Sequence, residues 1–411
     1  MTSGKENEEL SAASYSSPSR TGWENGTHNL SDFPQKSKRR SQMTFYIGVD
    51  LHKTQFTVHV RTEEMIESLN EIKMYPTTEA GYAEFTKRIR VYKETGAVVK
   101  LAVESTGNTK YFKNQMEKAG AEVKVVNTVK FKVINESVSK TDKHDAATLS
   151  EFLKDYKLPE SYLCSKETEN LRRLIKSRER LVRAQVGQKN EIHALLVSIG
   201  LADEARSLQS KKGRQKVLDT LESNNDYVLE AQSVKLMLEI IDTFAQKIKI
   251  IEKQLEELTK DDEMVKLLLT IRGCGKITAW IIRAYTEDIS RFANSKKYAA
   301  FCGLVPKVKD SNETVHHGSI TRHGPVELRT AFVQLFMGMR RCKDTKSWRM
   351  MQRYEYMKKN KGSGKSIISG ARKTAEIVWA LLTAKTEFDS AKMTGIYKPM
   401  NLTEQALAAA N

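Results

Sequence analysis

The chain has 411 residues, enough for two or three domains with cores of their own, and its formal net charge is +17. Such a charge predicts a polyanionic partner, either nucleic acid or an acidic membrane surface. No apolar run is long enough for a membrane span or a signal peptide, and the four cysteines form no Cys-x-x-Cys pair, which predicts a cytoplasmic protein without zinc or a disulfide framework.

The first half of the chain is expected to form an α/β domain behind a tail. Residues 1–42 are rich in Ser, Asn, Gly and Lys without periodic apolar positions, which predicts a disordered extension. From residue 43 to 160, short apolar strands alternate with helical patterns, which is typical of an α/β layer fold. The expected elements are, in chain order, a hairpin of strands at 45–50 and 55–61, a helix at 79–95, a strand at 98–104, a helix at 109–119 and a strand at 123–126.

Four carboxylates occupy positions from which they can meet. Asp50 closes the first expected strand, Glu104 closes the third, and Asp142 and Asp145 lie three residues apart at the start of an expected helix. Carboxylates so placed can converge on divalent cations, since Mg²⁺ or Mn²⁺ takes oxygen ligands and serves phosphoryl transfer without help from histidine or cysteine. Each residue alone has another explanation: Asp50 as a turn residue, Glu104 as a strand end and Asp142 as a helix cap.

The middle of the chain, residues 161–265, changes to long helices. One of them carries an apolar seam with alternating spacings of four and three residues, at Met237, Ile241, Phe244, Ile248, Ile251, Leu255 and Leu258. That spacing predicts a coiled-coil segment. Two interpretations remain open, namely a helical hairpin within one chain and a stalk that joins two protomers.

The helix that precedes this seam is rich in basic residues. Arg172, Arg173 and Lys176 begin a run of positive charges that continues to Lys189. In a chain of this net charge, the run predicts a surface that faces nucleic acid, and the alternative is a solvated helix face.

Residues 266–390 are expected to form a mainly α-helical domain, followed by a C-terminal tail at 391–411. Two glycines lie between Arg272 and Lys276 and precede a helix. Glycines at such a place let the amides of the helix N-terminus approach a phosphate, and the two basic residues favour the same ligand. A plain tight turn is the alternative.

Several motifs together resemble the insertion-sequence one-ten family of transposases. In the N-terminal half they are Gly48–Lys53, Glu104–Gly107 and Lys140–Ala146, which contain the four carboxylates in the order of that family's DEDD set. In the C-terminal half they are Ile271–Gly275, Gly303–Pro306, Asp310–Ser311, Gly318–Gly324 and Ala371–Leu382. The resemblance covers roughly residues 43–390.

This resemblance implies a fold and a mechanism. Members of the family have an N-terminal RuvC-like domain of the RNase H fold, whose DEDD metal site works with a serine from the transposase domain of a partner protomer. The serine attacks a DNA phosphate and forms a covalent phosphoserine link, while a structured bridge RNA from the same element pairs with donor and target DNA. The chain is therefore expected to be an Mg²⁺- or Mn²⁺-dependent DNA transposase, a homodimer or tetramer, in a prokaryotic cytoplasm and at the nucleoid.

The expected nucleophile is Ser311, because it follows the Gly-Leu-x-Pro motif at the position of the family's serine. The family usually has Ser-Gly at this place, whereas here Asn312 follows, so Ser319 in the same loop remains the alternative. Three histidines of this region are candidates for moving protons or contacting phosphate, with a solvent-exposed loop as the alternative: His316, His317 and His323.

Further basic residues are expected to contact DNA or RNA. Arg322 and Arg329 are candidates for holding the reacting phosphate, because a guanidinium matches phosphate oxygens bidentately, and a structural ion pair is the alternative for Arg329. Lys53, beside the predicted metal site, is expected to contact either a phosphate or a carboxylate.

Two rival functions share parts of these features. A RuvC-like nuclease or Holliday-junction resolvase uses the same four carboxylates with water as nucleophile, but it needs no serine and no Gly303–Arg329 block. A non-enzymatic nucleic-acid-binding protein accounts for the charge and gives the acidic residues a structural role.

Overall fold

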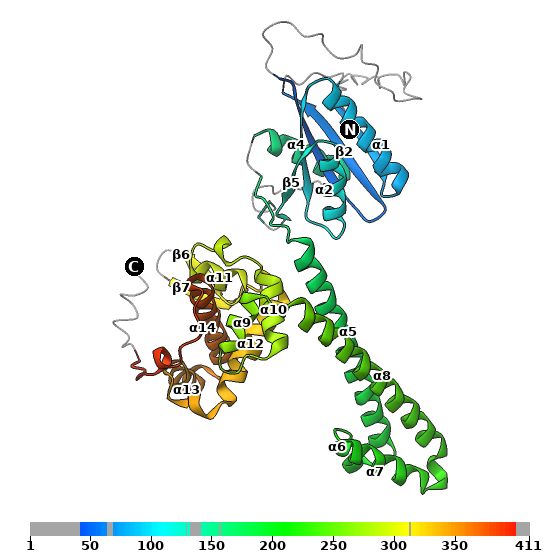
Figure 1. Ribbon diagram of the computed structural model, residues 1–411, viewed down its shortest axis with the longest axis vertical. Coiled ribbons are helices and arrows are strands. Elements are labelled where there is room, and N and C mark those ends of the chain that lie inside the picture. Colours follow the sequence, from blue (N-terminus) through cyan, green and yellow to red (C-terminus); the bar gives the residue numbers. More distant parts are fainter. Residues whose placement is uncertain are drawn as a thin grey trace, which may run out of the picture. The chain divides into compact units, whose positions relative to one another are not determined.

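The computed structural model describes residues 42–63, 69–128, 130–131, 141–155, 158–311 and 314–399, of which 308–311 and 314–317 through the backbone alone. The chain divides into an N-terminal unit, Met1–Leu163, and a C-terminal unit, Cys164–Asn411 (Figure 1). The predicted disordered extension lies outside the described residues, except for Gln42. Among the described helices, none is long and apolar enough to cross a membrane.

In its described part, the N-terminal unit is built on a five-stranded sheet with the order β3-β2-β1-β4-β5. The strands are β1 (Thr44–Leu51), β2 (Gln55–Thr62), β3 (Glu71–Pro76), β4 (Val98–Glu104) and β5 (Glu122–Val126). β1, β2 and β3 pair antiparallel, whereas β1, β4 and β5 pair parallel. The carboxyl ends of β1 and β4 therefore meet at one edge of the sheet, and the predicted α/β class is confirmed.

The outer strand β3 was not among the predicted strands. It alternates charged residues such as Glu71 and Lys73 with Ile72 and Met74, which are 43% and 54% exposed. An edge strand needs little apolar surface and tolerates a terminal proline. The mixed composition of β3 and its terminal Pro76 therefore differ from the patterns by which strands are predicted from sequence.

Helices lie on both faces of this sheet (Figure 1). On one face, α1 (Glu79–Glu94) and α2 (Thr109–Lys118) enclose an aromatic core in which the Phe56 ring contacts four other rings, those of Tyr75, Tyr82, Phe85 and Phe112. On the other face, α4 (Asp142–Lys154) packs on a second, smaller core with Tyr46 and Ala102. Since side chains alternate along a strand, Asp50 belongs to the α4 face of β1.

Gly48 brings α4 into direct contact with β1. A Cβ atom at this position would lie 2.0 Å from the carbonyl oxygen of Ala146 and 2.5 Å from the amide nitrogen of Ser150. The backbone of α4 thus rests on the backbone of the strand, and no side chain fits between them. Because Gly48 is two residues before Asp50, this contact places the first turn of α4 beside the end of β1.

The C-terminal unit contains two long helices, α5 (Lys166–Ser198) and α8 (Val228–Leu258), which pack against each other. The short helices α6 (Ala202–Ser207) and α7 (Lys211–Glu222) join them and share a separate apolar core with them. Of the predicted seam, three residues are buried, Ile241, Ile248 and Leu255, whereas Leu258 is 63% exposed. The prediction of long helices is confirmed; a coiled coil between protomers remains a prediction.

The rest of this unit is a mainly helical body, as predicted. Its helices are α9 (Glu263–Thr270), α10 (Lys276–Thr286), α11 (Ser295–Phe301), α12 (Val326–Arg341), α13 (Arg349–Lys361) and α14 (Ser363–Ala384). Leu171 and Ile175 of α5 and Leu255 of α8 belong to the same large core, so the long helices continue into this body. This body also contains the hairpin of β6 (Pro306–Ser311) and β7 (Thr314–Ile320).

Candidate functional site

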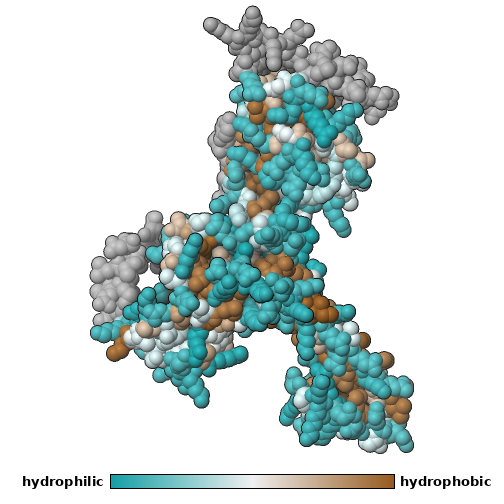
Figure 2. Space-filling model, viewed as in Figure 1, coloured by the Kyte–Doolittle hydropathy of each residue, from teal (hydrophilic) through white to brown (hydrophobic). Residues whose placement is uncertain are grey.

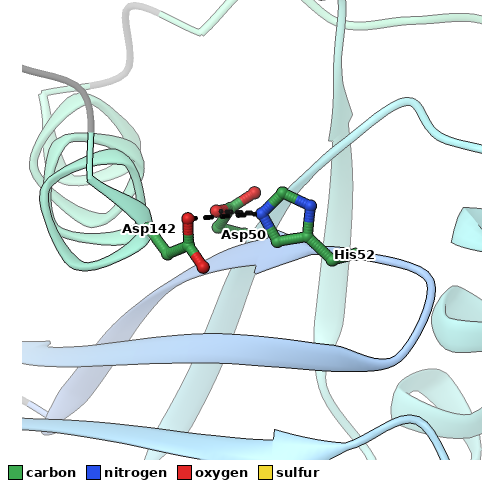
Figure 3. A group of neighbouring side chains, drawn as sticks. All are labelled: Asp50, His52 and Asp142. Atoms are coloured by element: carbon green, nitrogen blue, oxygen red, sulfur yellow. Dashed lines mark hydrogen bonds and ion pairs between the residues drawn. The ribbon is translucent and has the colours of Figure 1, made fainter.

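Asp50, His52 and Asp142 meet at the carboxyl end of β1 (Figure 3). The Nε2 atom of His52 lies 3.0 Å from Oδ2 of Asp50 and 3.5 Å from Oδ1 of Asp142. One ligand atom from each residue lies within 4.8 Å of the other two, a spacing that suits a shared cation. Asp50 is buried, whereas the side chains of Asp142 and His52 are 45% and 51% exposed, so the cluster opens to solvent.

The turn between β1 and β2 fixes the backbone beneath this cluster. The amide of His52 donates to the carbonyl of Gln55 at 2.9 Å, and the carbonyl of His52 accepts from Nδ2 of Asn108 at 3.1 Å. One residue further on, the hydroxyl of Thr77 donates to the carbonyl of Lys53. Asp50 itself lies within β1, opposite Thr57, so its interpretation as a turn residue is wrong.

The first turn of α4 supplies two of the predicted carboxylates, Asp142 and Asp145. The helix is capped by Thr141, whose hydroxyl accepts from the amide of His144 at 3.2 Å. The alternative interpretation of Asp142 as the helix cap is therefore wrong, and its carboxylate is available to the cluster. The partial positive charge of the helix N-terminus stabilises both carboxylates at this place.

The charges of this cluster shift the protonation of its members. Burial raises the pKa of the Asp50 carboxyl, the His52 ring opposes that shift, and the Asp142 and Asp145 carboxylates add to it. Burial lowers the pKa of His52, but the carboxylates of Asp50 and Asp142 outweigh this effect, so the pKa is raised. The nearby carboxylates thus raise the pKa of both Asp50 and His52. This concentration of negative charge favours a bound cation.

The two remaining acidic positions lie beside the cluster. Glu104 ends β4, the parallel neighbour of β1, and its side chain is half-buried. Asp145 is close enough to raise the pKa of Asp50. Neither belongs to the group of three that shares the 4.8 Å spacing. Lys53 is exposed in the turn after β1.

The residues present fit a divalent cation. Carboxylate oxygens and an imidazole nitrogen are both ligands for such ions. A further polar atom, the Oγ1 of Thr57, is fully buried on the same face of β2, directly opposite Asp50, and has no hydrogen-bond partner among the described residues. Asp50 and Asp142 would hold the ion, with Glu104 and Asp145 beside them.

Ser311 and Ser319 lie on the β6–β7 hairpin of the C-terminal unit. Ser311 is the last residue of β6 and pairs with Thr314, and Ser319 is exposed on β7. His316 and His317 pair with Lys309 and Val308, and the side chains in this part of the hairpin lie outside the description. His323 follows in an exposed loop.

At the base of this hairpin, the turn at Gly303 and the turn at Gly324 pack closely against each other. Gly303 (φ +69°) and Gly324 (φ +93°) adopt left-handed backbone conformations, and a Cβ at Gly324 would lie 1.9 Å from the carbonyl oxygen of Phe301. Arg322 also has a left-handed φ of +55°, which is strained for a residue with a side chain. Nη1 of Arg329 donates to the Arg322 carbonyl at 3.2 Å. Arg329 thus supports the loop that presents Arg322.

The basic residues of α5 divide into internal and external ones. Nε of Arg172 donates to the carbonyl of Ala284 at 2.8 Å, and its guanidinium lies over the Tyr285 ring, so Arg172 ties α5 to α10. Arg173 is paired with Glu169 one turn away, and its side chain is 67% exposed. Lys176 lies 3.7 Å from Glu327 of α12 and is 52% exposed. The last two remain accessible to nucleic acid.

The loop before α10 packs against α12. Gly273 (φ +83°) and Gly338 meet without side chains between them, because a Cβ on Gly338 would lie 2.4 Å from the Gly273 carbonyl oxygen. Arg272 pairs with Asp344 at 2.8 Å, and Lys276 pairs with Glu256 at 2.5 Å, all with exposed side chains. Gly273 therefore has the structural role of a tight turn, and phosphate binding by its basic neighbours remains a prediction.

Two family models match this chain, one in its N-terminal part and one in its C-terminal part. Residues 47–200 match the family model of DEDD transposases of the IS110 type, which is described as "Transposase". Residues 265–355 match the model described as "Transposase IS116/IS110/IS902 family". The first match begins within β1 and includes α4 and the whole of α5, and the second includes the hairpin and α12.

Full-length relatives are similar to this chain at low identity. A "Probable family 20 transposase" of Pseudomonas aeruginosa is 25% identical over 347 residues, which cover 83% of this chain and 97% of the relative. The "Transposase for insertion sequence element IS1111A" of Coxiella burnetii is 24% identical over 377 residues, 88% of this chain and 95% of the relative. The "Transposase for insertion sequence element IS1328" of Yersinia enterocolitica is 23% identical over 349 residues, 83% and 98% of the two chains.

The chain is a transposase, an enzyme that cuts and rejoins DNA, and its substrates are DNA. Within that class it belongs to the IS110 family of insertion-sequence transposases, which confirms the resemblance found in its motifs. A DEDD-type domain with this acidic cluster indicates a divalent cation as cofactor.

The sequence-based prediction of the site does not include His52, which belongs to the cluster, or Thr57, which borders it. His52 is two residues after Asp50, on the far side of a strand end, and only the turn brings its ring back to the carboxylates. Thr57 is found through strand register, since a hairpin with a turn at 52–54 places it opposite Asp50.

Proposed function

We propose that the chain joins DNA through Ser311 and a divalent cation, Mg²⁺ or Mn²⁺, held by the DEDD residues Asp50, Glu104, Asp142 and Asp145. The observation that carries this proposal is the meeting of Asp50 and Asp142 at the end of β1. Carboxylates this close repel each other unless a cation neutralises them, so a cluster of this kind on a rigid sheet favours a metal site.

The fold that we propose for the N-terminal unit is RNase H-like, of the RuvC type. A mixed sheet with helices on both faces supports it, as does the position of the acidic residues at the ends of the adjacent strands β1 and β4 and on α4. Residues 43–160 form this domain in the proposal, followed by a coiled-coil segment at 161–265 and the serine transposase domain at 266–390.

The serine provides the covalent step. The Ser311 oxygen forms a bond to phosphorus while a P–O bond of the DNA breaks; the serine proton passes to a base, and the leaving DNA oxygen takes up a proton. Attack by the hydroxyl of a second DNA end reverses these changes and frees the serine. A bound cation supplies charge stabilisation for the phosphate and for the leaving oxygen. Because the phosphoserine link replaces one ester with another, rejoining needs no separate energy source.

The reacting phosphate is held by Arg322 in this proposal. Its loop follows β7, is exposed, and is supported from below by the Arg329 guanidinium. The guanidinium of Arg322 has the geometry to bind two phosphate oxygens. Arg329 acts as a positioning residue, because its side chain contacts the Arg322 carbonyl.

The partners that we propose are donor DNA, target DNA and a structured bridge RNA from the same element. The net charge of +17 and the exposed side chains of Arg173 and Lys176 support a large polyanionic surface. Lys53, Arg272 and Lys276 are further candidate contacts.

The proposed assembly is a homodimer or tetramer. Six large apolar side chains of α8 are exposed, and five of them fall on one stripe of the helix, since they are spaced close to multiples of its 3.6-residue period: Leu229, Leu236, Ile240, Ile250 and Leu258 (Figure 2). A stripe of this kind on a long helix supports association with a second copy.

Trapping the covalent intermediate tests the proposal. The full chain is incubated with labelled donor-end DNA, the element's RNA and Mg²⁺, then denatured, and label on protein is measured for the wild type and for Ser311→Ala, Ser319→Ala and Asp50→Asn. We expect an adduct that is retained in Ser319→Ala and lost in Ser311→Ala and Asp50→Asn.

Three results would contradict this mechanism. DNA cleavage without an adduct, retained in Ser311→Ala, identifies a metal nuclease of the RuvC-like or resolvase type that uses water. An adduct that disappears only in Ser319→Ala moves the nucleophile to Ser319. DNA and RNA binding that survives in Asp50→Asn, together with no cleavage by the wild type, leaves a binding protein.

A further inference from the structure

The His52 ring lies at the place where the two carboxylates of the cluster converge. A single nitrogen, Nε2, is 3.0 Å from Asp50 and 3.5 Å from Asp142. This nitrogen carries at most one proton and can donate one hydrogen bond, which the shorter contact to Asp50 uses. The second carboxylate is therefore directed at a nitrogen that cannot satisfy both, and a cation that binds all three groups can.

The backbone of His52 is fixed, whereas its ring is not. Hydrogen bonds to Gln55 and from Asn108 hold the peptide groups on either side of the Cα atom. The side chain is 51% exposed, so the two carboxylates are the main contacts that orient the ring. A side chain that is anchored at its base and free at its tip can adjust to a ligand without disturbing the sheet.

Thr57 provides an independent sign that the cluster is incomplete. Its side chain is fully buried opposite Asp50, and its hydroxyl finds no hydrogen-bond partner among the described residues. A buried unsatisfied hydroxyl costs about 1–3 kcal/mol and is retained where a ligand or its water completes the bonding. A hydrated cation beside Asp50 brings such a partner.

We propose that His52 is a cation ligand together with Asp50 and Asp142, which gives the centre a mixed nitrogen and oxygen ligand set. This inference rests on the proposed metal site, to which it adds a ligand outside the DEDD set. An imidazole nitrogen suits Mn²⁺ and later transition ions better than Mg²⁺, which prefers oxygen ligands alone. The centre therefore selects Mn²⁺ over Mg²⁺ more strongly than four carboxylates do.

Pulsed electron paramagnetic resonance of the full chain with bound Mn²⁺ tests this ligand directly, because a coordinated imidazole couples its nitrogen nucleus to the metal electrons. The variants are His52→Gln and, as a matched control, His193→Gln on an exposed position of α5. We expect the nitrogen signal in the wild type and in His193→Gln and its loss in His52→Gln. Calorimetry is expected to give about 10-fold weaker Mn²⁺ binding in His52→Gln, with Mg²⁺ affinity changed less than about threefold.

The outcomes separate this inference from the metal site itself. Bound Mn²⁺ without a nitrogen signal, or with tighter binding in His52→Gln, overturns the role of His52 and leaves the carboxylate site intact. Mn²⁺ binding that is absent, or unaffected by Asp50→Asn, overturns both. Circular dichroism confirms that the variants are folded, which we expect because the replaced ring is half-exposed.

Discussion

The two candidate centres of this transposase are held in different ways. Asp50 sits in a strand buried along its whole length, and the helix that carries Asp142 is pressed onto that strand at Gly48. Ser311 ends a strand of a two-stranded hairpin, whose support is a pair of turns with left-handed backbone angles. Ligands of a cation must stay within a fraction of an ångström of each other, whereas a nucleophile must reach its phosphate and later release it. The difference in support matches this difference in task.

The largest expected effect separates the two centres by function. Ser311→Ala and Asp50→Asn should each lower DNA joining by about 1,000-fold or more. Calorimetry with Mn²⁺ should distinguish them, because Ser311→Ala keeps the wild-type affinity and Asp50→Asn loses it. Weakened Mn²⁺ binding in Ser311→Ala would mean that the serine also contributes to the metal site.

Gly48→Ala tests the rigid support of the first centre. The added methyl group meets the α4 backbone, so we expect destabilisation of about 3 kcal/mol and faster hydrogen exchange in α4. The matched control is Gly187→Ala, at an exposed position of α5 with no atom within 4 Å of the new Cβ. That change should stabilise its helix by about 1 kcal/mol. Similar exchange of α4 in both variants would show that close contact at Gly48 is not required.

The N-terminal unit should also lose stability in acid through His59. The ring is buried in β2, with Nδ1 2.7 Å from the Ser150 hydroxyl, and burial, aided by Arg61, lowers its pKa from 6.5 to about 4. Between these two values the unfolded chain binds the proton and the folded chain does not, so stability falls as pH drops from 6.5 to about 4.

This pH-dependent loss should reach at most about 3 kcal/mol, and His59→Leu should remove it. Hydrogen exchange of β2 peptides at several pH values measures the difference between the wild type and the variant, which cancels the contribution of other titrating groups. Parallel pH profiles for the two proteins would rule out the ring as the source.

The smallest expected effect concerns the support of the second centre. Arg322→Gly relieves the left-handed strain of its backbone and should stabilise the C-terminal unit by about 1 kcal/mol. DNA joining should nevertheless fall, because the guanidinium is lost. The described tryptophans all lie in this unit, at positions 280, 348 and 379, so their fluorescence reports its unfolding. Undiminished joining would remove Arg322 from the phosphate site.

Most of the fold follows from local patterns in the sequence. Four strands can be predicted from their apolar residues, namely β1, β2, β4 and β5. The helices α5 and α8 can be predicted from their length and their apolar periodicity. β3 is missed because this edge strand buries one side chain, Tyr75, and alternates the exposed Ile72 and Met74 with charged residues. The predicted seam on α8 is buried at Ile241, Ile248 and Leu255, whereas Leu258 at its end is exposed.

The candidate site was predictable where it depends on strand ends and not where it depends on distant contacts. Asp50 and Glu104 follow from the rule that parallel neighbours end at one edge. The backbone at His52 is held by a bond from Asn108, 56 residues away, and its ring contacts Asp142, which follows much later in the chain. The internal role of Arg172 depends on Ala284, 112 residues away. No local pattern carries such information.

The paired glycines 273 and 338 have a mechanical consequence. Backbone meets backbone there, with no compressible layer of side chains between the loop before α10 and the helix α12. A displacement of the loop must therefore move α12 with it. Arg329 is on that helix and donates a hydrogen bond to the Arg322 carbonyl. A displacement of Arg272 or Lys276 by a bound phosphate is therefore expected to shift the base of the hairpin as well. The helix α12 thus couples the position of the loop before α10 to the position of the hairpin that carries Ser311.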